Sequence, residues 1–133
     1  MANAIYPKFK EAILQSAANS NMSSGTVRVA LVDLGVYTYS ATHEFLTSLT
    51  GRVGTDQTLG TKTFVDGLFD AADSTHTAVT GATVEALVIY IDTGVAGTSR
   101  LISFHDTDVT GLPATPSGGN IDITWSASGI FQL

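Results

Sequence analysis

The sequence has 133 residues, of which 44% are hydrophobic and only 14% are charged, and its formal net charge is −6. A chain of this length builds one hydrophobic core, so we expect a single domain over residues 1–133. Six scattered basic residues on an acidic chain argue against direct binding to nucleic acid or to anionic membranes. The absence of cysteine excludes disulfides, thiolate catalysis and cysteine-based zinc sites.

One segment near the N-terminus, residues 5–18, has the periodicity of an amphipathic helix. Pro7 suits the first turn of such a helix, where its missing N–H group is harmless. Apolar residues recur at positions i, i+4, i+7 and i+8, namely Ile5, Phe9, Ala12 and Ile13. We expect residues 1–20 to form a helical segment that contacts a partner. The start of the chain lacks the pattern of a signal peptide, and no stretch reaches the roughly 20 apolar residues of a membrane helix.

From residue 26 onward, the chain has the pattern of short strands separated by turn residues. Residues 26–33 and 85–92 are β-branched and apolar, which predicts central strands. Residues 99–106 follow after a short loop that contains glycine, so a hairpin is expected there. Residues 62–70 predict two short extended pieces that pivot at Gly67.

Three further stretches give weaker signals. Residues 37–49 are mixed, with a short helical turn expected at 43–46. Residues 54–60 are rich in glycine and threonine and are expected to form a loop. Residues 75–79 alternate weakly between polar and apolar side chains.

The last part of the chain predicts a pair of strands, residues 120–125 and 129–133, joined through 126–128. In the first of these strands the apolar side chains share one face: Ile121, Ile123 and Trp125. The apolar C-terminus fits either a final core strand or burial at a subunit interface. Seven or eight short strands with regular turns predict an all-β fold, a β-sandwich or jelly roll, with one N-terminal helix.

No constellation of catalytic residues is recognisable. His43, His76 and His105 are far apart in sequence and have no paired metal-ligand spacing. No serine occupies a nucleophile elbow, and no glycine-rich loop carries the Lys-Ser/Thr of a phosphate-binding motif. The sequence therefore predicts no enzyme, no catalytic residue and no cofactor.

Two acidic turns offer carboxylates that a hard cation such as Ca²⁺ prefers. They are Asp70 with Asp73, and Asp106 with Asp108. Neither turn has the ligand spacing of an EF-hand, and acidic turns of β proteins are usually solvated. We expect no metal site, with a structural cation at one of these turns as the alternative.

Several segments, taken in order, form a pattern that spans nearly the whole chain. They are residues 5–12, 26–33, 37–46, 67–73, 85–94, 121–125 and 129–133. This pattern resembles a family of small virion structural proteins of tailed bacteriophages. The loop around residues 49–53 is shorter than in those relatives. The resemblance implies a decoration (cement) protein on the capsid, with a place in the tail, neck or baseplate as the alternative, and it supplies no catalytic residues.

The resulting expectation is a non-enzymatic protein made in the host cytoplasm and carried on the capsid surface of the virion. Its expected partners are the major capsid protein and further copies of itself, as a trimer or alternatively a dimer. The residues expected to make contacts are Ile5, Tyr6, Phe9, Trp125, Ile130, Phe131 and Leu133. A third hypothesis is a carbohydrate-binding adsorption module, for which Trp125 and the four tyrosines are the candidate exposed aromatics.

Overall fold

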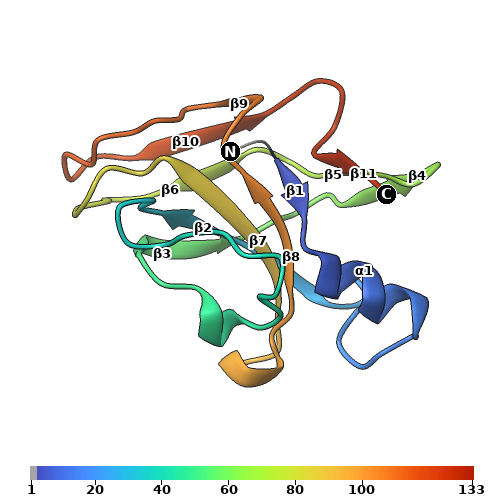
Figure 1. The fold of residues 1–133 in the computed structure, drawn as a ribbon. Coiled ribbons are helices and arrows are strands. Elements are labelled where there is room, and N and C mark those ends of the chain that lie inside the picture. The colour runs from blue at the N-terminus through green and yellow to red at the C-terminus, as the bar shows by residue number, and fades with distance from the viewer. Residues whose placement is uncertain (1–2) are drawn as a thin grey trace.

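The structure is a computed structural model that describes residues 3–133, so Met1 and Ala2 of the expected N-terminal contact segment lie outside the described residues. The protein is mostly β, with antiparallel sheets and one α-helix (Figure 1). In chain order the helices and strands are β1 (Ala4–Ile5), α1 (Pro7–Leu14), β2 (Thr26–Val32), η1 (Leu46–Ser48), β3 (Arg52–Thr58), β4 (Thr63–Val65), β5 (Leu68–Asp70), β6 (Ser74–His76), β7 (Ala86–Asp92), η2 (Ala96–Thr98), β8 (Leu101–His105), β9 (Val109–Thr110), β10 (Ile121–Trp125) and β11 (Phe131–Gln132).

The helix α1 is shorter than the predicted range of residues 5–18. Pro7 begins it, as predicted, and Phe9 and Ala12 on its inner face are buried. Ile5 lies outside the helix, in β1, where it pairs with Ser103 of β8. The residue before a proline is disfavoured in helical geometry, so the chain is extended up to Pro7 and the helix cannot start earlier.

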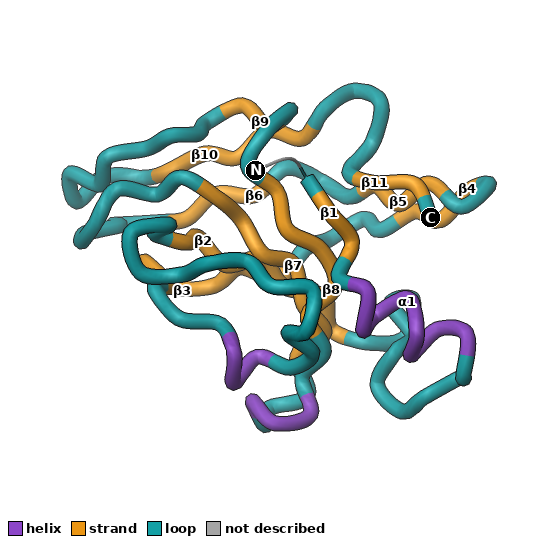
Figure 2. Tube along the Cα trace, in the orientation of Figure 1, coloured by secondary structure: helices purple, strands orange, loops and turns teal. Residues whose placement is uncertain are grey.

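A five-stranded antiparallel sheet with the order β1-β8-β7-β2-β3 forms the centre of the molecule. The two predicted central strands, β2 and β7, pair along their whole length, from Thr26 opposite Asp92 to Val32 opposite Ala86. The predicted hairpin is confirmed, because β7 pairs with β8 (Figure 2). These strands are nearly continuous in apolar residues because the sheet is covered on both faces.

Strand β3 occupies residues that were predicted to form a loop, so that prediction was wrong. It pairs with β2, and the register shifts between Val29 and Leu31. Gly54, inside β3, has a φ of +70°, which fits a bulge in the ladder. The glycine-rich sequence has a weak strand propensity, and its pairing with a long apolar neighbour overrides that propensity.

A second sheet has the order β6-β10-β9. In β10 the residues Ile121, Ile123 and Trp125 are buried, while Asp122 and Thr124 are exposed. The predicted alternation of this strand is therefore confirmed.

A third, smaller sheet has the order β11-β5-β4. The predicted pivot at Gly67 is confirmed, because β4 and β5 form a hairpin around it. The predicted pairing of the last strand with residues 120–125 was wrong, since β11 pairs with β5. At Gly129, with a φ of +97° and close to Leu68, the chain turns away from β10, and Ile130 then donates its N–H to the Phe69 carbonyl.

The five-stranded sheet is covered on both faces. On β8, the neighbouring residues Phe104 and His105 point to opposite faces. His105 packs against Trp125 of β10, with ring centroids 5.7 Å apart, and Phe104 packs against Tyr39 of the loop after β2, at 5.4 Å. One continuous hydrophobic cluster results, and it contains residues from all three sheets.

Residues 3–133 contain eleven strands, against the seven or eight expected, because several strands are only two or three residues long.

Candidate functional site

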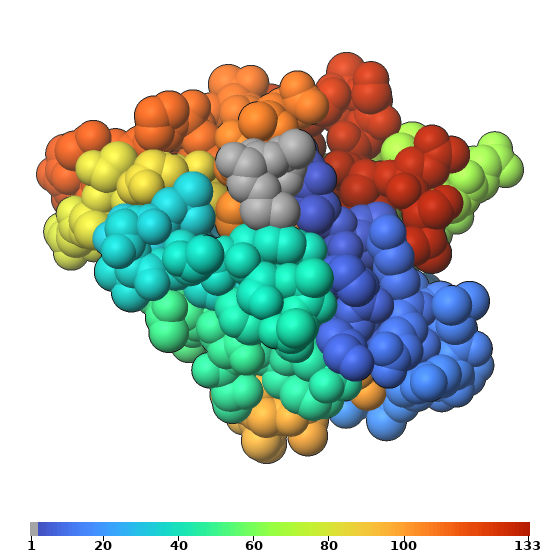
Figure 3. Space-filling model, in the orientation of Figure 1, coloured from blue at the N-terminus to red at the C-terminus, as the bar shows by residue number. Residues whose placement is uncertain are grey.

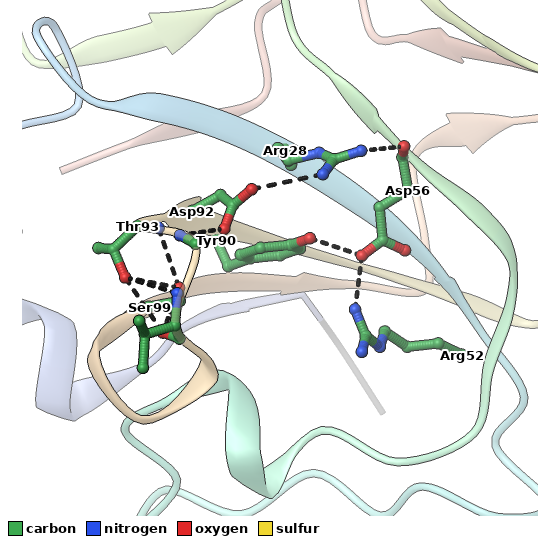
Figure 4. Close-up of polar contacts among 9 residues, drawn as sticks. Arg28, Arg52, Asp56, Tyr90, Asp92, Thr93 and Ser99 are labelled. Atoms are coloured by element: carbon green, nitrogen blue, oxygen red, sulfur yellow. Dashed lines mark hydrogen bonds and ion pairs between the residues drawn. The ribbon is translucent and has the colours of Figure 1, made fainter.

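A network of charged and polar side chains lies on the five-stranded sheet, where β2, β3 and β7 run side by side. The β2–β7 register places Arg28 directly opposite Tyr90. Figure 4 shows that Arg28, Tyr90 and Asp56 point toward one another. The members of the network are Arg28, Arg52, Asp56, Tyr90 and Asp92.

The Asp56 carboxylate is the centre of this network. The Tyr90 hydroxyl donates to Asp56 Oδ2 at 2.5 Å, and Arg52 Nη1 donates to the same oxygen at 2.7 Å. The side chain of Asp56 is only 5% exposed and Tyr90 is buried, so their bond is shielded from water, while Arg52 is 41% exposed and its bond is partly open to solvent. Burial, followed by the hydrogen bond to Asp56, raises the pKa of Tyr90 well above its usual range. The phenol therefore remains a hydrogen-bond donor.

Arg28 links the centre of the network to the end of β7. It donates to the Asp56 carbonyl oxygen at 2.5 Å and to Asp92 Oδ2 at 3.3 Å. Two arginines thus face two aspartates, and their charges balance. The arrangement ties three strands together but contains no nucleophile beside a free base, so it favours a structural role over a catalytic one.

The three histidines lie at separate places and have local partners. His43 Nδ1 is 2.8 Å from the Tyr37 hydroxyl, His76 Nδ1 donates to the Thr55 carbonyl oxygen at 3.2 Å, and His105 Nε2 is 2.8 Å from Ser103 Oγ. Burial lowers the pKa of His105 to about 4. The histidines therefore do not combine into one site.

Of the two acidic turns singled out as possible cation sites, the one at Asp70 and Asp73 uses its carboxylates to bind backbone. Asp70 Oδ1 accepts from the Ala71 N–H at 2.9 Å, and Asp73 Oδ1 accepts from the Trp125 N–H at 3.0 Å. Over residues 3–133 there is no group of three side chains suited to hold a metal ion.

The structure separates the predicted contact residues into two groups. Four of them are buried in the core of their own chain: Tyr6, Phe9, Trp125 and Ile130. Ile5 and Phe131 are half-buried, and Leu133 is 60% exposed. Trp125 is only 6% exposed, so in this fold it offers no platform for a sugar ring. The contact prediction therefore narrows to Ile5, Phe131 and Leu133.

Two exposed apolar residues on the sheet β11-β5-β4 are not among the predicted contact residues. Phe64 is 41% exposed and Val65 is 68% exposed, and the exposed Leu133 directly follows β11 at the other edge of the same sheet. We call Phe64, Val65 and Leu133 the distal patch. Figure 3 shows the β4–β5 hairpin, in light green, projecting from the body beside the red C-terminal strand. The β-branched and aromatic residues of this stretch predict a strand, but the sequence carries no signal that separates an exposed edge strand from a buried one.

Phe69 anchors the distal patch to the core. Its ring is 5.5 Å from that of Phe64 and 5.3 Å from that of Phe131, measured between centroids. These three rings form a row across β4, β5 and β11, and Phe69 is buried. The hairpin is therefore held in place although its outer strand is exposed.

No protein-family model and no characterised protein matches this chain. The resemblance to phage virion proteins consequently stays a prediction from the sequence segments. No helix within the described part of the chain has the length and apolar character needed to cross a membrane.

Proposed function

We propose that this chain is a non-enzymatic structural subunit of a tailed-phage virion, and that it is a decoration (cement) protein on the capsid surface. The observation that carries the proposal is the distal patch, a set of exposed apolar side chains on a small sheet whose β4 edge is unpaired. Exposed apolar groups beside a free strand edge are typical of surfaces that other proteins cover. The polar network, by contrast, is occupied by contacts within the chain.

The proposal includes the finer architecture of the fold, a β-sandwich, with the jelly roll as its narrower form. Two contacts across the sheets support it. Trp125 of β10 packs on His105 of β8, and His76 of β6 donates to the Thr55 carbonyl of β3. A rigid sandwich suits a subunit that must hold a contact surface in one geometry.

The physical basis of a decoration role is mass action. A protein that binds only the assembled shell stabilises that shell, and the stabilisation grows with the logarithm of its free concentration relative to its Kd. Many copies on one lattice add avidity, so a modest contact area per copy suffices. The major capsid protein and further copies of this chain, in a trimer or a dimer, are the proposed partners.

The test is co-sedimentation of the purified chain with capsid shells. We expect the wild-type protein to sediment with the shells, and Val65→Glu to remain in the supernatant, because a charge in the distal patch is costly to bury. Val95→Glu is the matched control, since Val95 is 61% exposed but lies outside the patch. Failure of the wild-type protein to bind any form of the shell would overturn the decoration role.

The alternative within the same class is a tail, neck or baseplate subunit. The distal patch would serve such a subunit equally well, because it fits any structural neighbour. A reconstruction of the particle separates the two roles: copies spread over the whole shell indicate decoration, and a single ring at one vertex indicates a tail or neck.

A further inference from the structure

The outer edge of β4 is a free hydrogen-bonding edge. No strand among residues 3–133 pairs with it, since the sheet order β11-β5-β4 places it last. The turn to β5 consists of Asp66 and Gly67, with φ of +53° and +78°, as in a two-residue type I′ hairpin. In such a hairpin the flanking residues Val65 and Leu68 form a hydrogen-bonded pair. The next pair, Phe64 and Phe69, is therefore a non-hydrogen-bonded pair. The N–H and C=O of Phe64 therefore point outward.

From this edge we infer that β4 pairs with β4 of a second copy of the chain, antiparallel and around a two-fold axis at Phe64. In that register Phe64 lies opposite Phe64 of the second copy, and Thr63 lies opposite Val65 of the second copy. The two outward-facing Phe64 backbones then exchange both hydrogen bonds, as an antiparallel ladder requires. The pairing joins two three-stranded sheets into one continuous sheet.

Charge complementarity selects a second copy as the occupant. Lys62 and Asp66 flank β4 on either side, so in the same register Lys62 of each copy lies near Asp66 of the other, and two opposite-charge pairs flank the two-fold axis. Lys62 Nζ donates to the carbonyl oxygens of Met22 and Gly25, both at 2.7 Å. An ammonium group has three N–H donors, so one is left for a carboxylate. Cross-strand pairs of opposite charge stabilise a sheet, and like charges oppose it.

The aromatic row supports the same register. The row Phe131, Phe69 and Phe64 within one copy continues into Phe64 of the second copy, because directly opposed residues lie on one face. Phe64 also lines an open surface depression of about 1040 Å³ together with Phe9 and Met22, so its ring is left partly uncovered by its own chain.

The contact is short, since β4 has three residues. A stable dimer interface normally buries about 1,200–2,000 Å², and a three-residue strand pairing buries less. We therefore expect a weak, concentration-dependent dimer in solution. The inference deepens the proposed function, because two copies bound side by side on a lattice would be at the high effective concentration that such a contact needs.

Disulfide trapping tests the register, because the chain has no cysteine of its own. Thr63→Cys and Val65→Cys are exposed positions that we expect to tolerate substitution. In the proposed register, Thr63 of one copy and Val65 of the other form a non-hydrogen-bonded pair. The Cα atoms of such a pair are about 4.5 Å apart, within the range of a disulfide. Identical residues of the two copies are offset by two positions, or about 6.8 Å along the strand. A mixture of the two variants should give a crosslinked dimer under mild oxidation, and each variant alone should not.

A charge variant gives an independent readout by sedimentation equilibrium. Asp66→Asn keeps a side chain that accepts positive φ but removes the charge opposite Lys62, so it should shift the monomer–dimer equilibrium toward monomer. Asp108→Asn is the matched control, because Asp108 is also exposed and has a φ of +57°. It should leave the equilibrium unchanged.

Equal crosslinking in the mixture and in each variant alone, or none in any of them, would overturn the inference. A wild-type protein that is monomeric at all concentrations would do so as well. Binding to capsid shells is measured separately, on the monomeric sample. If the protein binds capsid shells but does not self-pair, this inference alone is rejected. If it crosslinks as expected but does not bind the shells, the decoration role alone is rejected.

Discussion

Asp56 holds two donors on one buried oxygen, because the Tyr90 hydroxyl and Arg52 Nη1 both bind Oδ2. Removing a buried acceptor leaves its former donors without partners, and this costs more than the net contribution of the hydrogen bonds themselves. The residue therefore matters for stability although it is not placed to react.

We expect Asp56→Ala to lower the free energy of unfolding by about 2 kcal/mol, the usual cost of leaving a buried donor such as the Tyr90 hydroxyl without its acceptor. Urea unfolding followed by circular dichroism measures the loss. Glu11→Gln is the control, because Glu11 pairs with Lys8 at an exposed site and should change stability by less than about 0.5 kcal/mol. Equal effects of the two variants would contradict the structural role of Asp56.

His105 gives the stability a defined pH dependence. Its pKa is lowered from 6.5 to about 4, first by burial, with an opposing contribution from Asp106. The unfolded state therefore binds the proton more readily than the folded state between these values. The contribution of neutral His105 is present in full above pH 6.5 and is lost as the pH falls toward about 4. This loss amounts to about 3 kcal/mol.

The variant His105→Gln tests this dependence, because glutamine keeps a polar contact for Ser103 and does not titrate. In urea unfolding at several pH values, it should show a shallower decline between pH 6.5 and about 4 than the wild-type protein. Burial also lowers the pKa of His76, so part of the decline should remain. Identical slopes for both proteins would count against a buried, neutral His105.

The stability and register of the β4–β5 hairpin depend on the left-handed backbone conformation of its turn. Gly67 has a φ of +78°, and a Cβ at this position would lie 3.3 Å from the Leu133 carbonyl oxygen. The register of the exposed edge depends on this turn, since a two-residue loop fixes which residues face outward.

Gly67→Ala should therefore cost about 1–2 kcal/mol of unfolding free energy, because an L-residue is strained at positive φ. Gly97→Ala serves as the comparison, since a Cβ there meets nothing within 4 Å and its φ is not in the left-handed region. Thermal unfolding of both variants provides the measurement. A Gly97→Ala variant as unstable as Gly67→Ala would show that turn strain is not the cause.

For the whole molecule, the single hydrophobic cluster predicts one cooperative unfolding transition. The near-ultraviolet signal of Trp125, which reports on β10, should change together with the far-ultraviolet signal of the sheets. We expect the two denaturant midpoints to coincide. Separate midpoints would indicate that the small sheet or the N-terminal segment unfolds on its own, and would contradict the prediction of one domain.

The sequence by itself determined the elements whose pattern is local. Strands β2 and β7 follow from unbroken β-branched stretches, β10 follows from the alternation of Ile121, Ile123 and Trp125, and the turn at Gly67 follows from its residue type. In each of these cases a short window contains the physical cause, which is side-chain period or backbone freedom.

Only the tertiary structure decided which residues face a partner strand, the core or the solvent. Strand β3 forms because β2 offers it a ladder, and Asp56 meets Tyr90 only through β2 lying between their strands. The apolar residues Trp125 and Val65 look equally suited to a contact, yet one is buried and the other exposed. Burial depends on contacts between segments that are distant along the chain, and a local window does not contain that information.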